Sequence, residues 1–448
     1  MPGIAGITAP RTEARVGRML DALSHRGPAG RAAEEADGIT LGVVWTTLQP
    51  ETGDRLQGEH LVADETSNSR FARAQISDGQ LLLERDPLGV APLYYGTTAE
   101  GHLCFASEVK GLLSETREVR EFPPGHRYTA GRFESLDGRP PEPPLQGSPE
   151  RIAGDLRLHL ERAVARRVAG TAAGSWLSGG LDSSTMAALA RPHLSRLPTF
   201  AAGFAGAPDL QYARAVAEHL DTDHHEILVT LEDLVEALPE VIYHLESFDA
   251  LLVRSSLVNF LASRRAGDHV PAVLSGEAGD ELFAGYDYLR DLPTEDLSAE
   301  LADITGRLHN TALQRVDRSA AAYGTVAFVG FTDPDLVDYA RRIPAEYKLH
   351  NGVEKWILRR AMEDSLPAQV VHRRKDKFWS GAGVQDLVAR YAEEHISDAD
   401  FRRERRLSNG WQLHSREELM YYRTFREHFG DLDDLSWMGR TKGAPVAA

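Results

Sequence analysis

The sequence has one cysteine, Cys104, and its longest apolar runs, such as residues 39–45, fall far short of the roughly 20 residues that span a bilayer. A single cysteine excludes an internal disulfide framework and a zinc site built from several cysteines. The first residues, Met1 to Gly6, contain neither the basic stretch nor the apolar core of a signal peptide. We therefore expect a cytoplasmic protein with no membrane partner.

The sequence is also poor in positive charge relative to negative charge. Fifty Lys and Arg residues stand against 67 Asp and Glu residues, which gives a net charge of −17. A surface this acidic repels nucleic acid, so nucleic acid is not an expected partner. A bound polyanion must be held at a local site, and a nucleotide with Mg²⁺ meets that description. The hydrophobic fraction of 42% is that of a globular protein, and 448 residues predict more than one domain.

The strongest break in the pattern lies at residues 136–150, where repeated prolines and glycines predict a linker. The linker separates a domain of residues 1–135 from a domain of residues 151–448. In the first domain, turn residues separate short β-like runs, which predicts a mainly β structure. These runs are residues 39–45, 80–83, 93–95 and 102–106.

In the second domain, predicted strands alternate with predicted helices, which is typical of a parallel sheet with helices on both faces. The predicted strands are residues 175–177, 199–204, 225–229 and 270–274. The predicted helices are residues 152–168, 183–190, 210–220, 231–246 and 256–265. We expect the chain after about residue 290 to be mostly helical.

A glycine-rich motif at residues 177–184, Leu-Ser-Gly-Gly-Leu-Asp-Ser-Ser, follows a predicted strand and begins a predicted helix. Glycines let the backbone approach a ligand closely, and the amides of a helix N-terminus attract phosphate. No Gly-Lys-Ser/Thr follows, so this is not a Walker A loop. The motif resembles the PP-loop of the ATP pyrophosphatases, which cleave ATP to AMP and pyrophosphate. The alternative, a glycine-rich turn with a serine N-cap, is weakened by the strand–loop–helix context.

An acidic motif at residues 274–286, Leu-Ser-Gly-Glu-Ala-Gly-Asp-Glu-Leu-Phe-Ala-Gly-Tyr, also follows a predicted strand. Both motifs should therefore lie at the carboxyl edge of the sheet, where open α/β folds bind ligands. Asp182 and Asp280 are then candidate ligands of a Mg²⁺ ion on the β- and γ-phosphates. The alternative is an acidic helix N-terminus stabilised by the helix dipole.

Further segments extend the similarity along the chain, and together they resemble the asparagine synthetase superfamily, in particular the bacterial glutamine-dependent type. The matching segments are residues 200–203, 224–226, 241–246, 317–318, 354–359, 366–367, 373–375 and 418–423. The resemblance implies an α/β domain of the ATP-pyrophosphatase, adenine nucleotide α-hydrolase-like, type. It implies ATP and Mg²⁺ as cofactors, an acyl adenylate formed from a carboxylate, and acyl transfer to an amine. β-Lactam synthetases, carbapenam synthetases and lasso-peptide cyclases belong to the same superfamily.

The resemblance also implies a role for each matching site residue. Lys375 would meet the phosphates and the developing oxyanion, with Lys377 as second candidate and a solvated surface lysine as the alternative. Glu277 would orient or deprotonate the amine. The residues with implied adenosine contacts are Leu177, Ala202 and Gly276. Those with implied pyrophosphate or ATP contacts are Ser178, Gly179, Gly180, Asp182, Ser183, Ser184 and Ser275.

The N-terminal domain resembles an α+β glutaminase of the N-terminal-nucleophile type, but its catalytic residues are missing. The nucleophile of the family is a cysteine exposed by removal of the first methionine. Position 2 here is Pro2, and Cys104 lies within a predicted strand. The Asn-Gly-Glu segment that holds glutamine and many residues between Pro50 and Asp78 are also missing. We expect a degenerate domain without glutaminase activity. The segments that keep the resemblance are residues 3–7, 25–28, 85–89, 92–96, 105–108 and 124–126.

The expected substrate pocket departs from the family as well. Val326 and Phe328 stand where the family's asparagine synthetases have a glutamate and an arginine, and Leu251 and Leu252 replace two threonines. Loss of these polar partners disfavours aspartate, whose charges need them, although ordinary drift of core residues is an alternative. We expect the four side chains to form one apolar wall near the acyl group. The retained Arg254 would hold an anionic group of the substrate.

These features predict an AMP-forming carboxylate–amine ligase that joins a small carboxylate to an amine or to ammonia, in specialised natural-product or antibiotic biosynthesis. One alternative is an ammonia-dependent asparagine synthetase. Another is a non-catalytic scaffold relative, against which the retention of Asp182, Asp280, Glu277 and Lys375 argues. The two substrates and the oligomeric state stay open, and a homodimer is compatible with the sequence.

Overall fold

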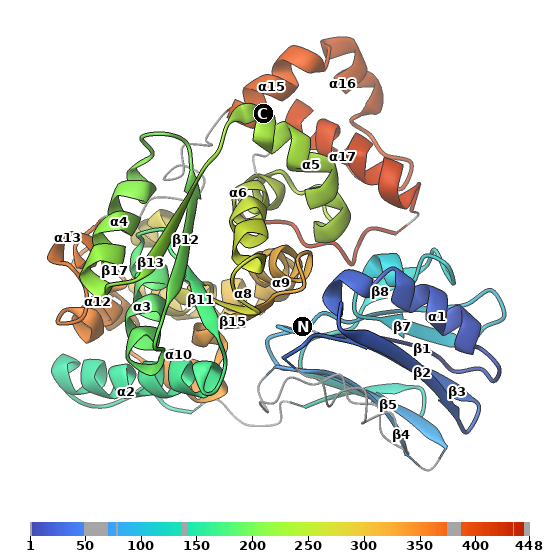
Figure 1. The fold of residues 1–448 in the computed structure, drawn as a ribbon, viewed down its shortest axis with the longest axis horizontal. Coiled ribbons are helices and arrows are strands. Elements are labelled where there is room, and N and C mark those ends of the chain that lie inside the picture. Colours follow the sequence, from blue (N-terminus) through green and yellow to red (C-terminus); the bar gives the residue numbers. More distant parts are fainter. Residues whose placement is uncertain are drawn as a thin grey trace.

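The computed structural model describes residues 2–48, 70–77, 79–136, 142–373, 387–432 and 434–442. It has a β-rich N-terminal domain, at the right of Figure 1, and an α/β C-terminal domain at the left. Both are of the class predicted from the sequence. Within the described ranges, every helix is too short or too polar to cross a bilayer.

The N-terminal domain is a sandwich of two antiparallel sheets. One sheet has the strand order β2-β3-β1-β7-β6-β8, and the other has the order β10-β9-β5-β4. Helix α1 (Glu13–Asp21) packs on the first sheet, on the side away from the second (Figure 1). The predicted deletion between Pro50 and Asp78 falls mostly outside the described residues. The strands are β1 (Gly3–Ile7), β2 (Gly30–Ala36), β3 (Ile39–Trp45), β4 (Ala72–Ser77), β5 (Gln80–Arg85), β6 (Tyr94–Thr97), β7 (Leu103–Ala106), β8 (Val119–Glu121), β9 (His126–Thr129) and β10 (Arg132–Ser135).

The C-terminal domain contains a parallel sheet of five strands in the order β13-β12-β11-β14-β15. The strands are β11 (Ala173–Trp176), β12 (Pro198–Gly203), β13 (Asp223–Leu228), β14 (Ala272–Ser275) and β15 (Val326–Val329). Strand β11 is central, the chain then adds β12 and β13 on one side, and it crosses over to add β14 and β15 on the other. A small antiparallel pair, β16 (Leu349–His350) and β17 (Val353–Glu354), lies outside this sheet.

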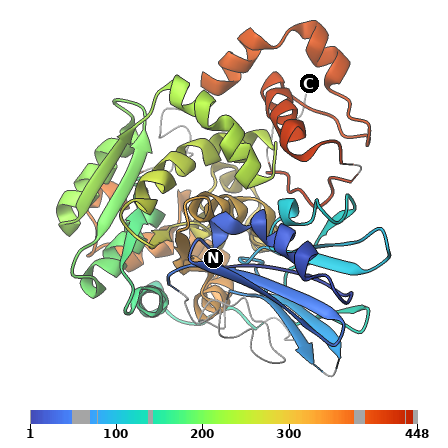
Figure 2. The same cartoon turned by 45° about the vertical axis from the view of Figure 1, so that its right-hand side comes forward.

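Helices cover both faces of the parallel sheet (Figure 1). Helix α3 packs on β11 and β14, whereas α6 packs on β12 and α9 packs on β15. Helices α15 and α17 pack over α5, at the top of Figures 1 and 2. The helices are α2 (Pro149–Val168), α3 (Leu181–Ala190), α4 (Pro208–Leu220), α5 (Leu231–Leu245), α6 (Ala250–Gly267), α7 (Gly279–Phe283), α8 (Thr294–Gly306), α9 (Ala312–Ala321), α10 (Pro334–Arg342), α11 (Ala345–Lys348), α12 (Trp356–Met362), α13 (Ala368–Val371), α15 (Leu387–His395), α16 (Asp398–Glu404) and α17 (Arg416–Phe429).

Local sequence explains where the long helices begin. The Ser148 hydroxyl caps α2 by accepting a hydrogen bond from the Arg151 amide, and Thr230 and Asp233 form a capping box at α5. Asp249 caps α6 by accepting from the Leu252 amide at 2.9 Å. Each such cap stabilises its helix by about 1 kcal/mol. Because α2 already begins at Pro149 and residues 137–141 are not described, the domain boundaries stay a prediction.

The chain after residue 290 is mostly helical, as expected, and strand β15 is an exception that the sequence did not indicate. The apolar run Val-Ala-Phe-Val is four residues long, too short for its periodicity to separate strand from helix. Parallel pairing with β14 decides the outcome, with Ala272 opposite Val326 and Leu274 opposite Phe328. The other predicted strands and helices of the C-terminal domain are present, with shifted ends.

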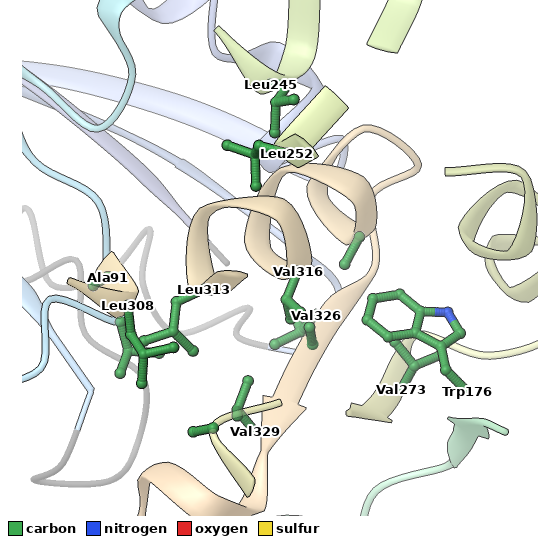
Figure 3. Close-up of a cluster of buried hydrophobic side chains, with 14 of the residues drawn as sticks. Ala91, Trp176, Leu245, Leu252, Val273, Leu308, Leu313, Val316, Val326 and Val329 are labelled. Atoms are coloured by element: carbon green, nitrogen blue, oxygen red, sulfur yellow. The ribbon is translucent and has the colours of Figure 1, made fainter. Parts of the chain in front are cut away.

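The two domains share one hydrophobic core. A single cluster of buried side chains runs from β1 through the parallel sheet to α17. Figure 3 shows Ala91 of the N-terminal domain beside Leu308 and Leu313 of the C-terminal domain. Because apolar surface is buried across the domain boundary, the domains support each other's folding.

The domain boundary also buries a set of charged side chains, here called the interdomain ion cluster. Arg26 donates to Glu108 at 2.5 Å and to both carboxylate oxygens of Asp317 at 2.8 and 2.9 Å. Every member is at most 7% exposed. Charges buried this deeply are tolerated only when they are paired and hydrogen-bonded. The N-terminal domain supplies Arg26, Glu108 and Lys110, and the C-terminal domain supplies Glu246, Asp317 and Arg318.

We expect the interdomain ion cluster to make stability fall at acidic pH. Burial alone would raise the pKa of Asp317, but Arg26 and Arg318 outweigh it and hold the pKa below its ordinary value. The unfolded chain therefore binds more protons than the folded chain between about pH 5 and pH 2, so stability is lost as pH falls through this window.

Thermal unfolding followed by circular dichroism across that window tests this expectation. Asp317→Asn should be less stable at neutral pH and should show a shallower dependence on pH than the natural protein. Equal slopes for the two proteins would contradict it. Two residues outside the cluster contact it, His25 at Glu108 and Arg70 at Asp317, and both are the same residues in the two proteins.

Candidate active site

The PP-loop-like segment and the acidic segment lie side by side at the carboxyl edge of the parallel sheet. One follows β11 and the other follows β14, and these two strands are neighbours. The strand order reverses between them, because β12 and β13 extend the sheet on one side and β14 and β15 on the other. Such a switch point is where open α/β sheets bind ligands.

The segment at residues 177–184 forms a tight loop that leads into a helix N-terminus. Gly179 has a φ of +69°, and a side chain there would meet the Ala213 backbone nitrogen at 2.4 Å. Ser178 and Ser183 share a hydrogen bond of 3.0 Å between their hydroxyls. Helix α3 begins after Gly180, which provides no side-chain cap, so its first-turn amides remain available to a ligand.

The two segments touch so closely that neither can carry extra atoms at the contact. A Cβ at Gly276 would lie 2.5 Å from the Ser183 nitrogen, and one at Gly279 would lie 2.5 Å from Asp182 Oδ1. Between them, Ala278 has a φ of +72°, a conformation that is strained for a residue with a side chain. Strain of this kind persists where the surrounding structure enforces it, and it gathers at functional sites.

Lys355 joins the two segments, and the sequence analysis gave it no role. Its ammonium group contacts Asp182 and lies 2.6 Å from Asp280 Oδ1, and the residue is 1% exposed. Lys355 precedes α12 with a φ of +53°, and its amide donates to the Phe283 carbonyl at 3.1 Å. The lysine lies in the matched segment 354–359, but its carboxylate partners are far away in the sequence, so only the fold could identify them.

The Asp182 and Asp280 carboxylates fit a magnesium ion. Both face one buried cation, Lys355, which shows that two hard oxygen donors converge on a single point. Within the described residues, no cage of three or more His, Cys, Asp or Glu side chains could hold a metal. Two carboxylates suit Mg²⁺, which commonly takes its other ligands from substrate phosphates and water.

A further carboxyl group at the site, that of Glu281, is buried. Burial raises the pKa of Glu281 to about 8, and the adjacent Asp280 carboxylate adds to the rise. The Tyr286 hydroxyl donates to Glu281 Oε1 at 2.5 Å. A neutral Glu281 at physiological pH limits the repulsion among the acidic side chains of this loop.

Glu277 forms an ion pair with Arg315 of α9. The Glu277 side chain is 22% exposed and that of Arg315 is 12% exposed, so the pair lies at the edge of the site. Glu277 was expected at the site from the sequence, whereas Arg315 was not. The guanidinium fixes the direction of the carboxylate, which is what an acid–base group needs.

Lys375 and Lys377 lie outside the described residues. The described chain reaches Arg373, which donates to Asp209 at 2.6 Å and to the Gly179 carbonyl at 3.4 Å. The guanidinium of Arg373 also stacks 4.1 Å above the centre of the Tyr212 ring. The chain thus comes to the glycine-rich loop two positions before Lys375.

The other named nucleotide residues lie at the same edge. Leu177 directly follows β11, and its amide donates to the Phe200 carbonyl of β12 at 2.8 Å. Ala202 lies near the end of β12, and Ser275 ends β14. Ser184 is buried, and its hydroxyl has no hydrogen-bond partner in the part of the chain that the structure describes. The contacts of these residues with ATP stay a prediction.

The residues of the expected apolar wall do not lie on one surface. Helix α9 packs between α6 and β15, and Figure 3 shows Leu252 and Val326 on opposite sides of it. Both side chains belong to the hydrophobic core, as ordinary core residues do. Leu251 is buried but outside the core cluster, and Phe328 is only partly buried. The expectation of one continuous wall therefore needs correction, and Leu251 and Phe328 are the better pocket candidates.

Arg254, the expected anion-holding residue, forms a two-point ion pair with Glu417 of α17. Its Nε lies 3.1 Å from Glu417 Oε1, and the Tyr421 hydroxyl donates to the same carboxylate at 2.8 Å. Glu417 could not be paired with Arg254 from the sequence, because the two residues are 163 positions apart. A role of Arg254 in substrate binding stays a prediction.

Comparisons with known proteins agree with this geometry. A family model described as asparagine synthase matches residues 155–304 and 294–442. A model described as glutamine amidotransferase domain matches residues 56–129. The resemblance found in the sequence is confirmed.

Individual relatives are similar over most of the chain. The glutamine-hydrolysing asparagine synthetase 2 of Arabidopsis thaliana is 34% identical over 399 residues, which cover 80% of this chain and 66% of that protein. The asparagine synthetase 2 of Oryza sativa subsp. japonica is 32% identical over 83% of this chain and 67% of its own length. That of Sandersonia aurantiaca is 33% identical over 83% of this chain and 75% of its own.

We expect Lys355→Met to destabilise the protein because it removes the cation shared by two largely buried carboxylates, those of Asp182 and Asp280. Removing one partner from a buried charge cluster lowers the free energy of unfolding by about 3–5 kcal/mol. Added MgCl₂ should recover part of the loss if the Asp182 and Asp280 carboxylates accept Mg²⁺. Chemical denaturation with and without MgCl₂ measures both effects.

Lys348→Met is the matched control for this prediction. Lys348 is 5% exposed, and among the described residues the charged group that acts on it is the like-charged Arg341, not a carboxylate. Burial lowers the pKa of Lys348 to about 7. Its loss should not destabilise the protein or create a response to MgCl₂. Equal effects of the two substitutions would contradict the assigned pairing.

Proposed function

The chain belongs to the asparagine synthetase family, and we propose that it is an ATP-dependent amide synthetase that forms an acyl adenylate from a carboxylate and transfers the acyl group to an amine or ammonia. The observation that carries this proposal is the convergence of Asp182 and Asp280 on Lys355, beside a glycine-rich loop with available amides. A non-catalytic scaffold has no need of a buried lysine and a strained Ala278 at such a place.

In the first half-reaction, an oxygen of the carboxylate attacks the α-phosphorus of ATP, and the bond to the bridging oxygen of pyrophosphate breaks. Asp182 and Asp280 would hold Mg²⁺, which when bound neutralises charge on the departing phosphates. The amides at the start of α3 and the hydroxyls of Ser178 and Ser183 would bind pyrophosphate. Lys355 would stay near the phosphates, whether or not it keeps its contacts with the Asp182 and Asp280 carboxylates.

In the second half-reaction, the amine attacks the acyl carbon and AMP leaves with its phosphate oxygen. The attacking amine must lose a proton, and Glu277 would accept it or orient the amine. Arg315 would keep the Glu277 carboxylate pointed into the site. Lys375 would stabilise the oxyanion that develops on the acyl group, a proposal supported by the position of Arg373 at the loop.

We propose that the N-terminal domain has no glutaminase activity. Cys104, the one cysteine in the sequence, is fully buried in β7. Burial raises the pKa of its thiol to about 12, with Glu115 adding to the rise, so the reactive thiolate is scarce at neutral pH. The matching residues 56–129 would then keep the fold of a glutaminase without its chemistry.

The acyl substrate is proposed to be a carboxylate with an apolar body, in a specialised biosynthetic pathway. Phe328 provides no charge to bind the ammonium and side-chain carboxylate of aspartate, and Leu251 adds apolar surface. The names of the relatives favour the second candidate, glutamine-hydrolysing or ammonia-dependent asparagine synthesis. Substrate preference separates the two candidates.

We expect exchange of labelled pyrophosphate into ATP to depend on an added carboxylate. Aliphatic and aromatic carboxylates should support faster exchange than aspartate, because apolar surface gains about 25 cal/mol per Å² when it is removed from water. Asp182→Asn should lower the rate by about 100-fold or more. If aspartate gives the fastest exchange, the chain is an asparagine synthetase; if no carboxylate supports exchange, the synthetase proposal fails.

We expect no release of glutamate from glutamine. The measurement is glutamate formation above a blank without enzyme, with the natural protein and Cys104→Ala in parallel. The two proteins should behave alike, because a buried, protonated thiol is a poor nucleophile. Glutamate release that is lost in Cys104→Ala would contradict the proposal.

A further inference from the structure

We infer that the N-terminal domain positions the substrate pocket of the C-terminal domain, through Lys110 and Arg26. Each of these cations holds one of the two elements that flank the pocket: the turn before α6, and helix α9. The inference rests on the proposed function for its kinetic test but not for its structural test. It gives the degenerate domain a role in amide synthesis that is independent of glutamine.

The first anchor is a binding site for the Glu246 carboxylate, built by the N-terminal domain. The amides of Val109 and Lys110 donate to its two oxygens at 3.1 and 2.8 Å. The Lys110 ammonium lies 3.1 Å from Glu246 Oε1. Glu246 is fully buried, so these three donors replace its lost hydration. One carboxylate of the C-terminal domain is thus held by three donors from the other domain.

The Glu246 anchor leads directly to the pocket. Glu246 ends α5 with a φ of +58°, a conformation that a residue with a side chain keeps only when its surroundings enforce it. Three residues later Asp249 caps α6, and Leu251 and Arg254 lie on its first turns. The direction in which α6 enters the pocket therefore depends on the hold on Glu246.

The second anchor is the two-point pair between Arg26 and Asp317 of α9. Arg315, two residues earlier on the same helix, pairs with Glu277. The position of α9 relative to the N-terminal domain therefore determines whether the Arg315 guanidinium reaches the Glu277 carboxylate. By holding α9 in place, Arg26 indirectly positions Glu277, the proposed acid–base residue.

Arg318 joins the two anchors into one network. It donates to Glu246 and to Asp317 at 3.0 Å each, and lies 3.3 Å from Glu108. In the described parts of the chain, the hydrogen bonds and ion pairs of this network do not include residues 177–184. Loosening the network should therefore disturb the carboxylate pocket and leave the nucleotide loop intact.

The test uses the full-length protein with Lys110→Met, Glu246→Gln and the double variant. Arg127→Met is the matched control, because the Arg127 side chain is 43% exposed and its ion pair with Glu84, at 2.7 Å, stays within the N-terminal domain. Pyrophosphate exchange is measured with the carboxylate that supports the fastest exchange in the natural protein. The KM for this carboxylate should rise about tenfold or more in both single variants, with the KM for ATP within about twofold.

The double variant should be no worse than the worse single variant, because both substitutions remove the same interaction. Arg127→Met should match the natural protein. Equal rises in the two KM values, or a loss confined to kcat, would show general structural damage and overturn the inference.

Hydrogen–deuterium exchange tests the inference without any substrate. Lys110→Met should accelerate amide exchange at residues 247–254 and leave residues 178–190 unchanged. Unchanged exchange at residues 247–254 would overturn the inference. If no carboxylate supports pyrophosphate exchange in the natural protein, the proposed function fails, and this measurement alone decides whether the N-terminal domain positions α6.

Discussion

The close contact of two loops at the centre of the parallel sheet is the constraint on which the site depends. Asp182 and Asp280 can share Lys355 only because Gly276 and Gly279 let the loops touch. The contact also fixes Ala278 in a strained conformation. The resulting arrangement places two carboxylates, a cation and free helix amides at one point, which is the chemistry that a magnesium-bound triphosphate requires.

Much of this could be predicted from the sequence, because the glycine-rich and acidic motifs are local. Each motif follows a buried strand, and parallel strands bring their carboxyl ends to one edge. What the sequence could not provide is pairing over long distances. Lys355 with Asp182, Arg315 with Glu277 and Arg254 with Glu417 are separated by 173, 38 and 163 residues. The residues that surround a lysine or arginine in the sequence do not indicate which carboxylate it pairs with.

The apolar wall fails for a related reason. Leu252 and Val326 stand where the resemblance implies polar side chains, but a sequence does not tell whether an apolar residue faces a ligand or a helix. Here α9 lies between the two residues, and both side chains belong to the hydrophobic core. Strand β15 was likewise not predicted. Its four residues are too few to show the alternation of a strand, and only their pairing with β14 identifies them as one. In both cases a tertiary contact decides what the local sequence leaves open.

The balance of charge in the described part of the site bears on which carboxylate it selects. Three cations, Lys355, Arg315 and Arg254, face four carboxylates, those of Asp182, Asp280, Glu277 and Glu417. These groups sum to one negative charge, so they cannot attract an anion by net charge alone. Attraction would then come from the proposed Mg²⁺ ion and from groups beyond the described residues, among which Lys375 is the proposed one. A substrate with a single carboxylate and an apolar body makes the smallest demand for positive charge, whereas each further anionic group would have to displace an existing ion pair.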